Sequence, residues 1–292
     1  MKIKDMFKMG KTVFSFEVFP PKTTSPVETI YQTLEPLSDL KPDFISVTYG
    51  AGGMGQKNHT AEIAAVIKHN YNIEPVAHLT CLSYSKEQIL SMLEELKAND
   101  VENILALRGD RSPTVKPLGE FNYASELVSF IKRNGDFGIS GACYPEGHIE
   151  ASSTVDDIKN LRTKVMCGAE HLISQLFFDN SFFYDFLEKA RIAGIDVPVQ
   201  AGIMPVVNRR QIERMVTMCG ASLPQKFTKM MQRYGDYPDA MFEAGIAYAI
   251  DQITDLLSHG VDGIHLYTMN NPEVAIRIYN SIGSLIRLNK QE

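Results

Sequence analysis

The sequence lacks an excess of positive charge, paired cysteines and long hydrophobic runs, and each absence excludes a class of protein. It has 29 lysines and arginines against 35 acidic residues, a formal net charge of −6. General nucleic-acid or anionic-membrane binders need a basic surface, although a local basic pocket for a small anion is compatible with this balance. No apolar run reaches the ~18 residues of a membrane span, and residues 1–10 hold no apolar signal core. We therefore expect a soluble, cytoplasmic protein with no nucleic-acid or membrane partner.

Cysteine is scarce, and the four cysteines are not spaced as in metal sites. Cys81, Cys143, Cys167 and Cys219 form neither a C-x-x-C pair nor a zinc-finger spacing with histidine. Each lies in or beside an apolar stretch, which favours buried free thiols over a catalytic cysteine. The sequence therefore predicts a reducing compartment and no metal site.

The composition is that of an ordinary globular protein, with 44 % apolar and 22 % charged residues among 292. This length allows two small domains or one large barrel. Strand-like and helix-like segments alternate along the chain, with no composition break and no linker. The expected strands cover residues 13–18, 44–48, 74–80, 103–107, 138–143, 171–176, 197–203 and 263–267. The expected helices cover residues 26–40, 61–69, 86–98, 123–133, 155–167, 182–193 and 274–288, with a long helical region over 209–258.

Three of these helices have the spacing of a capping box at their start: Ser25 with Glu28, Ser85 with Gln88, and Thr154 with Asp157. Repeated strand–helix units form parallel sheets with crossover helices. Eight such units in a chain of this length predict an α/β fold, a (β/α)8 TIM barrel that forms a single domain over residues 1–292.

Polar residues gather at the carboxyl ends of the expected strands. They are Glu17, Thr48, Tyr49, His78, Arg108, Gly109, Asp110, Tyr144, Gln175 and Tyr267. The seventh strand runs into the segment Gly202-Ile203-Met204-Pro205. In a barrel these ends converge on one face, where active sites are built. A scatter of polar residues over both ends would be expected by chance, so the clustering predicts an active site.

Residues 50–55 match the dinucleotide fingerprint G-x-G-x-x-G after a strand. The following strand ends in His78 rather than in the acidic ribose ligand of that fingerprint. The next helix also begins late, near Asn58 or Thr60, and not at the third glycine. A βα loop lying over a cofactor is therefore favoured over a Rossmann site.

Glu17 lies between Phe16 and Val18 in a run that is otherwise apolar. An ionised carboxylate is costly in such a setting, which favours the protonated form that a general acid needs. The alternative is that strand alternation directs Glu17 outward to solvent. Barrel strands are buried on both faces, which favours the functional interpretation.

Other polar residues have both a structural and a functional interpretation. Arg108 and Asp110 are two residues apart and could simply pair with each other, and His78 could be a satisfied core histidine. Asp157, Asn160 and Lys164 share one helix face. A solvated polar face is the alternative for all three, and helix capping alone could explain Asp157.

Several sequence blocks resemble methylenetetrahydrofolate reductases, in the order found in that family and over nearly the whole chain. They lie at residues 14–21, 46–50, 77–81, 107–110, 144–148, 175–179, 202–205 and 266–268. The resemblance implies a TIM barrel that uses FAD to reduce 5,10-methylenetetrahydrofolate to 5-methyltetrahydrofolate, in one-carbon metabolism and methionine biosynthesis. It also implies the short bacterial type, because no segment after the eighth helix matches the regulatory domain of eukaryotic members.

The same resemblance implies a role for individual residues. Glu17 matches the general acid, and Asp110 matches the aspartate beside the flavin ring and the pterin. The FAD contacts implied are Thr48, Tyr49, Ala51, His78, Arg108, Gly109, Asp110, Tyr123, Ala124, Tyr144, His148, Asp157, Asn160 and Lys164. The substrate contacts implied are Glu17, Asp110, Gln175, Gln211 and Tyr267.

The resemblance further implies that NADH or NADPH and the folate use the same flavin face in turn, by ping-pong kinetics, in a homo-oligomer. Two alternatives are a flavin subunit that receives electrons from a partner protein and a flavin barrel of the proline-dehydrogenase type. Two positions depart from the family. Thr163 stands where a second basic residue is common, with Arg162 as a possible substitute, and Asn271 stands where arginine is common.

Overall fold

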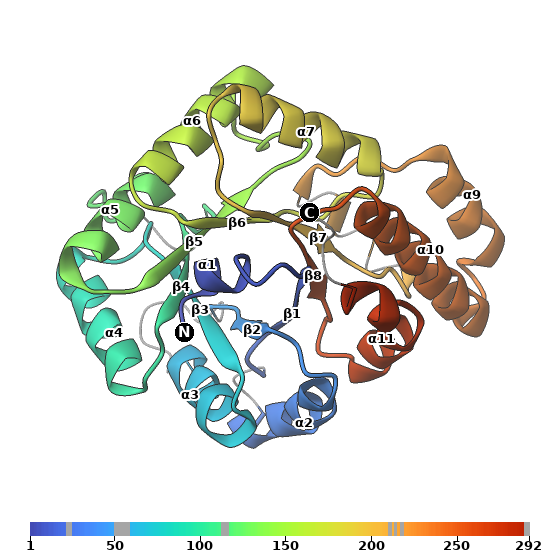
Figure 1. Ribbon diagram of the computed structural model, residues 1–292, viewed down its shortest axis with the longest axis horizontal. Helices are drawn as coiled ribbons and strands as arrows, with labels where there is room; N and C mark the ends of the chain where they lie inside the picture. The colour runs from blue at the N-terminus through green and yellow to red at the C-terminus, as the bar shows by residue number, and fades with distance from the viewer. Residues whose placement is uncertain are drawn as a thin grey trace.

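Eight parallel strands close into a barrel in which each strand is hydrogen-bonded to the next and β8 is bonded to β1 (Figure 1). The computed structural model describes residues 1–21, 25–49, 59–111, 117–209, 212, 215–216 and 219–288. The strands are β1 (Val13–Val18), β2 (Phe44–Val47), β3 (Glu74–Thr80), β4 (Asn103–Leu107), β5 (Gly138–Cys143), β6 (His171–Ser174), β7 (Val199–Ile203) and β8 (Gly263–Tyr267). The predicted (β/α)8 TIM barrel is confirmed.

Helices surround this ring of strands, as Figure 1 shows. They are α2 (Tyr31–Asp39), α3 (Thr60–Tyr71), α4 (Lys86–Ala98), α5 (Ala124–Asn134), α6 (Thr154–Met166), α7 (Asn180–Ile192), α9 (Gln225–Tyr234), α10 (Pro238–Ser258) and α11 (Pro272–Ile286). A 3-10 turn, η1 (Val27–Ile30), precedes α2. No helix in the described part of the chain is long and apolar enough to cross a membrane.

The expected element boundaries differ from the observed ones where a side chain or a proline interrupts the pattern. β6 ends at Ser174 because the N–H of Leu176 donates to the side-chain Oε1 of Gln175. That N–H is therefore not available to bond a neighbouring strand. β7 begins at Val199 because Pro198 has no N–H to donate. Within the described residues, the long helical region after β7 includes the separate helices α9 and α10.

One of the three predicted capping boxes is confirmed and two are wrong. Ser85 Oγ accepts from Gln88 N–H while Gln88 Oε1 accepts from Ser85 N–H. The first helix instead begins as a 3-10 turn after Pro26, with no side-chain cap. The helix predicted to start after Thr154 is capped one residue earlier by Ser153, which accepts from the N–H of Asp156.

The short helix α1 (Ile3–Met6) covers the amino-terminal end of the barrel. Ile3 and Met6 are buried against the first inward residues of the strands, among them Val13 and Phe44. The side chain of Asn103 joins the helix to β4, because its Oδ1 accepts from the N–H of Ile3, 3.0 Å away. The amino-terminal end is therefore filled, so that the carboxyl ends of the strands are left for a site.

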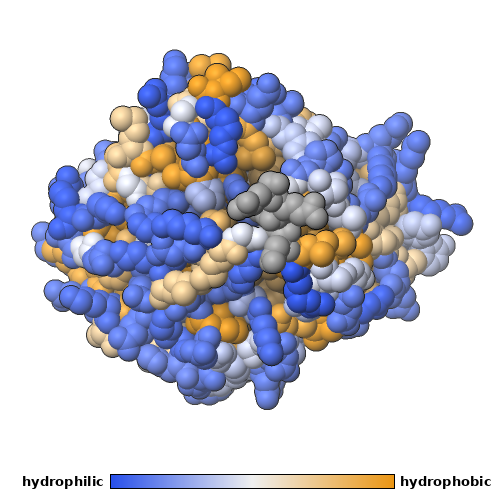
Figure 2. Space-filling model, viewed as in Figure 1, coloured by the Kyte–Doolittle hydropathy of each residue, from blue (hydrophilic) through white to orange (hydrophobic). Residues whose placement is uncertain are grey.

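The barrel interior is unusually polar. Interiors of this fold are mostly filled by branched apolar side chains. Here the buried residues of the strands include Ser15, Ser46, His78, Asn103, Ser140, His171, Gln200 and His265. The large apolar core lies instead between the strands and the surrounding helices, where Phe14, Phe16 and Val18 of β1 pack. On the surface shown in Figure 2, hydrophilic residues predominate and hydrophobic ones form small separate groups.

Candidate active site

Glu17 faces the barrel interior at the carboxyl end of β1. The residues at either side of it, Phe16 and Val18, are buried in the core under the helices. Because side chains alternate along a strand, Glu17 points to the opposite face, together with Val13 and Ser15. Its side chain is 20 % exposed. The alternative that Glu17 merely points to solvent outside the barrel is therefore wrong.

Two buried imidazoles lie next to the Glu17 carboxyl group. Its Oε2 is 3.5 Å from Nε2 of His78 on β3 and 3.8 Å from Nε2 of His265 on β8. Burial lowers the pKa of His78 to about 4, although the charge of Glu17 opposes this shift. His78 is therefore neutral near pH 7, and its Nε2 is buried without a hydrogen-bond partner. His265 was not among the residues predicted from the sequence. The pattern that could have identified it is its place two residues before Tyr267 on β8, which puts both side chains on the inner face of the barrel.

Tyr267 and Gln175 line the same end of the barrel. Tyr267 is the register partner of Glu17, and its hydroxyl donates to the carbonyl oxygen of Ser174, 2.7 Å away. Burial raises the pKa of Tyr267 well above its ordinary value. A Cβ at Gly202 would lie 2.8 Å from the Tyr267 ring, so glycine is needed there. Within the described residues, Gln175 uses Oε1 in its own turn, and no hydrogen bond engages its Nε2.

Arg108 does not pair with Asp110, which corrects one of the alternatives drawn from the sequence. Its two terminal nitrogens each lie 2.7 Å from an oxygen of Glu150, in a bidentate ion pair. Gly109 has φ +87° and turns the chain against Thr80, so that Asp110 emerges exposed beyond β4. The ion pair joins the loop after β4 to the loop after β5 and leaves the Asp110 carboxylate at the barrel mouth.

Lys164 lies under the end of β5 rather than on a solvated helix face. Its Nζ donates to the carbonyl oxygen of Ala142, 2.6 Å away, and burial lowers its pKa. Burial also raises the pKa of Asp157, against a backbone hydrogen bond from His148 and the charge of Lys164. Asn160 is exposed. Because Ser153 caps α6, helix capping does not account for an aspartate at position 157.

The remaining predicted residues border the same end of the barrel or lie outside the described residues. Tyr144 and His148 meet edge to face with their ring centroids 4.6 Å apart, and burial raises the pKa of Tyr144. Thr48 N–H donates to Val18 O, and Tyr49 packs against Tyr84. Tyr123 is 63 % exposed at the start of α5, next to Ala124. Ala51, Gln211 and the glycine-rich stretch 50–55 fall outside the described residues.

The two positions that depart from the family have local structural roles. Thr163 is exposed, and its hydroxyl donates to the carbonyl oxygen of Lys159 one turn earlier in α6. Asn271 caps α11, because its Oδ1 accepts from the N–H of Val274, 3.4 Å away. Its neighbour Asn270 bonds both backbone groups of Phe19 and so fastens the segment after β1.

Two nitrogen groups at this end of the barrel have hydrogen-bonding capacity left for a ligand. An ammonium group has three donors, and Lys164 uses one of them on Ala142 among the described residues. Buried polar groups without a full set of partners are costly, which favours a ligand that completes them. The unpartnered Nε2 of His78 lies further along the same ring of strand ends. A donor is thus available at β5, and a ring nitrogen without a hydrogen bond is available at β3.

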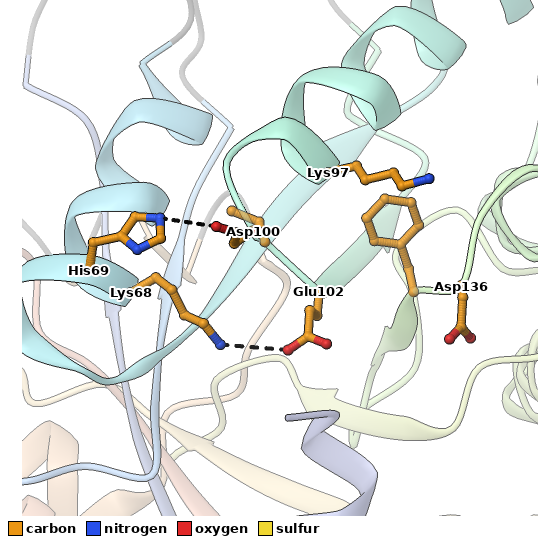
Figure 3. A pocket seen from close by; sticks show the side chains of 8 residues that line it. Lys68, His69, Lys97, Asp100, Glu102 and Asp136 are labelled. Carbon is orange, nitrogen blue, oxygen red and sulfur yellow. Dashed lines mark ion pairs between the residues drawn. The ribbon is translucent and has the colours of Figure 1, made fainter.

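A hollow at the opposite end of the barrel, of about 440 Å³, is a different feature. Figure 3 shows that Lys68, His69, Lys97, Asp100, Glu102 and Asp136 line it. Lys68 is 3.5 Å from Glu102, and His69 is 3.6 Å from Asp100. Glu102 and Phe137 directly precede β4 and β5, so the hollow lies at the amino-terminal ends, which are not where barrels build active sites.

Comparison with known proteins points to one family. The family model described as methylenetetrahydrofolate reductase matches residues 2–283. A 5,10-methylenetetrahydrofolate reductase of Pectobacterium carotovorum is 38 % identical over 94 % of this chain and 91 % of its own length. The Escherichia coli enzyme of the same name is 36 % identical over 94 % of this chain and 92 % of its own.

Two further similarities are of a different kind. Methylenetetrahydrofolate reductase (NADH) 1 of Arabidopsis thaliana is 37 % identical over 97 % of this chain, which spans 50 % of the plant protein. A solved Clostridium thermocellum protein that binds two copies of 5-methyl-5,6,7,8-tetrahydrofolic acid matches with a TM-score of 0.65. That match covers 98 % of this chain and all of the other at 14 % identity, and it concerns the fold alone.

Proposed function

The chain belongs to the methylenetetrahydrofolate reductase family, and we propose that it reduces 5,10-methylenetetrahydrofolate to 5-methyltetrahydrofolate. The proposed cofactor is noncovalent FAD, and the proposed electron donor is NADH or NADPH. One observation carries the proposal: Glu17 places a carboxyl group inside the mouth of the barrel, beside a neutral imidazole. A proton donor in that position is what opening of the folate's five-membered ring requires.

Glu17 is the proposed general acid. The one-carbon unit of the substrate is held in a ring between two nitrogens, and a proton delivered to one nitrogen favours opening to an iminium ion. The exposed carboxylate of Asp110 at the same end of the barrel favours positive charge on that ion. Gln175 would donate a hydrogen bond from its amide to the pterin, and the ring of Tyr267 would pack against the pterin. Gln211 is a further proposed contact and lies outside the described residues.

The residues around β2 to β6 are proposed to hold FAD. Lys164, with donors to spare beside Ala142, would hold the diphosphate, and Asp157 and Asn160 would face the same part of the cofactor. His78, with an unpartnered Nε2, would contact the flavin end. When bound, FAD supplies hydride transfer between NAD(P)H and the folate, while the protein supplies orientation and charge. The remaining proposed contacts are Thr48, Tyr49, Ala51, Arg108, Gly109, Asp110, Tyr123, Ala124, Tyr144 and His148.

The proposal includes ping-pong kinetics, in which the nicotinamide and the folate occupy one site in turn. It further includes a single catalytic domain, a homo-oligomeric state, a cytoplasmic location and a role in supplying methyl groups for methionine biosynthesis. Each of these properties is inferred for this chain from its membership of the family.

Anaerobic reduction of the purified protein tests the function. The protein should be yellow or become yellow with added FAD, bleach with NADH or NADPH, and regain its colour with methylenetetrahydrofolate. Bound FAD that neither pyridine nucleotide bleaches would point to a partner protein as the electron source. A protein that cannot be loaded with FAD would contradict the proposal, and reoxidation by proline-derived substrates but not by folate would favour another flavin barrel.

A further inference from the structure

Three fully buried polar side chains form a connected path beneath Glu17. They are Gln200 on β7, Ser15 on β1 and His265 on β8, each with no exposed surface. Ser15 and His265 are register partners, and Glu17 with Tyr267 is the next inward pair. Because apolar side chains would fill the barrel at less cost, this path requires an explanation beyond packing.

The backbone orients the amide group of Gln200. Its Nε2 lies 3.2 Å from the carbonyl oxygen of Val13 and 3.3 Å from that of Ile264. Carbonyl oxygens can only accept, so the amide atom that faces them is the NH2 group. Gly263 makes room for this arrangement, since a Cβ there would lie 2.7 Å from Gln200 Cγ.

Ser15 passes this orientation on to His265. Its Oγ is 3.1 Å from Gln200 Nε2 and 2.7 Å from His265 Nδ1. The amide nitrogen can only donate, and its two hydrogens are shared among Val13 O, Ile264 O and Ser15 Oγ. Within the described residues, His265 Nδ1 is the one acceptor bonded to the Ser15 hydroxyl, so the serine proton is directed at Nδ1. A neutral imidazole that accepts at Nδ1 carries its proton on Nε2. The path thus selects the Nε2–H tautomer of His265.

Nε2 of His265, which carries the proton in this tautomer, faces the candidate acid. Nε2 is 3.5 Å from Ser46 Oγ and 3.8 Å from Glu17 Oε2, the same oxygen that His78 approaches. Within the described residues, no hydrogen bond or ion pair engages Glu17 Oε1. Such contacts are often long in substrate-free sites and tighten when the substrate binds. Oε2 is therefore the oxygen that faces both imidazoles, and Oε1 is the one available to transfer a proton.

We propose that His265 is a positioning residue for Glu17, held by Gln200 and Ser15 as the Nε2–H tautomer. This rests on the proposed function, in which Glu17 Oε1 gives its proton to a folate nitrogen. Nε2–H then donates to Oε2 of the resulting carboxylate, stabilises that anion and keeps Oε1 directed at the substrate. Among the described residues, the titratable groups that face Glu17 are His78 from β3 and His265 and Tyr267 from β8. His265 in turn interacts electrostatically with His78 and with His171 from β6.

The barrel provides a matched control for the serine–histidine bond. Ser140 Oγ lies 2.9 Å from His171 Nδ1, and these two residues are also register partners, on β5 and β6. His171 packs against Phe7 from the amino-terminal segment, with ring centroids 4.8 Å apart. Gln200 and His265 both act on the pKa of His171, but among the described residues no hydrogen bond or ion pair joins it to Glu17. Ser140→Ala therefore removes the same kind of buried bond as Ser15→Ala, away from the acid.

Two measurements on the flavin-loaded protein test the proposal. Without folate, NMR of 15N-labelled histidines, with His265→Gln for assignment, should show His265 as the Nε2–H tautomer. Ser15→Ala should convert that signal to a tautomer mixture, and Ser140→Ala should leave it unchanged. In stopped-flow reoxidation by methylenetetrahydrofolate, Ser15→Ala should be about tenfold slower, with the falling limb of its pH profile about one unit higher, because the carboxylate loses a donor.

A proton on Nδ1 of His265 in the wild-type protein would overturn the proposal, as would equal pH profiles for the two serine variants. Neutron diffraction of the wild-type protein locates the same proton even if Ser15→Ala does not fold. The tautomer is read without substrate, so its result is independent of turnover. A chain with the expected tautomer that does not reduce methylenetetrahydrofolate would contradict the proposed function while supporting the hydrogen-bonded path.

Discussion

The ammonium group of Lys164 donates a hydrogen bond to the carbonyl oxygen of Ala142, 2.6 Å away, at the end of β5. The stem of the lysine crosses Gly141, where a Cβ would lie 2.8 Å from Lys164 Cδ. Glycine at that position therefore lets the side chain run inward from α6. A partly satisfied ammonium beneath the strand ends is a suitable partner for a phosphate oxygen.

Removal of this charge should weaken FAD binding. We expect Lys164→Ala to release flavin on dilution, and Lys164→Met, which keeps an apolar stem, to behave similarly because the charge is the lost element. Fluorescence titration of the apoprotein with FAD measures the affinity. Lys159→Ala is the control, since Lys159 lies on the same helix with 73 % of its side chain exposed. Unchanged FAD affinity in both Lys164 variants would rule out a phosphate contact.

Asp110→Asn should change the redox behaviour of bound flavin as well as folate turnover. A carboxylate near the flavin ring disfavours the negatively charged reduced form, so its removal should raise the midpoint potential. Anaerobic redox titration followed by absorbance gives that potential. Asp251→Asn on α10, 66 % exposed and paired with Lys226, should leave it unchanged. A potential that Asp110→Asn does not move would place this carboxylate away from the ring.

Buried histidines should make the fold sensitive to mild acid. Burial lowers the pKa of His78 to about 4 and that of His171 to about 3, from an ordinary value of 6.5. The unfolded chain then binds more protons below pH 6.5, so stability is lost as pH falls from 6.5 toward these values. Each histidine should cost about 2 kcal/mol of unfolding free energy between pH 7 and 5.

Urea unfolding at the two pH values measures this loss. His171→Gln keeps an acceptor for Ser140 but cannot take up the proton, so its loss should be about 2 kcal/mol smaller than that of the wild-type protein. His69→Gln, at a position where the side chain is 52 % exposed, should retain the wild-type dependence. Equal losses in all three proteins would mean that His171 is not buried in the neutral form.

The sequence predicts the barrel and the inward position of Glu17 for the same reason. Strand alternation places Phe16 and Val18 in the apolar layer under the helices, so the residue between them must face the barrel. The repeat of strand and helix depends on short-range patterns of this kind. Boundaries fail where a single group intervenes, as Gln175 does at the end of β6.

Pairings across the barrel could not be predicted in the same way. Arg108 and Asp110 are neighbours in sequence, but the turn at Gly109 separates them and Glu150, from the next loop, takes the guanidinium. His265 and Ser15 are 250 residues apart, and nothing local indicates that they share a hydrogen bond. Such contacts follow from strand register, which the sequence pattern alone does not specify.

Glu17→Gln should separate the two half-reactions. Reduction of bound flavin by NADH requires no proton donor to a folate nitrogen, so this variant should bind FAD and bleach at a near-normal rate. Glutamine keeps the shape and hydrogen bonding of the side chain but cannot donate that proton. Its reoxidation by methylenetetrahydrofolate should therefore slow by roughly 10²–10⁴-fold, the usual contribution of a general acid.

Stopped-flow absorbance follows each half-reaction of Glu17→Gln separately, with Glu146→Gln as a matched control. Glu146 lies in the loop after β5, where its carboxylate accepts the N–H of Ser222, and we expect its variant to retain both rates. Equal slowing of both half-reactions in Glu17→Gln would mean that this residue maintains the flavin site. An unchanged folate rate at pH 7 would show that the proton does not come from Glu17.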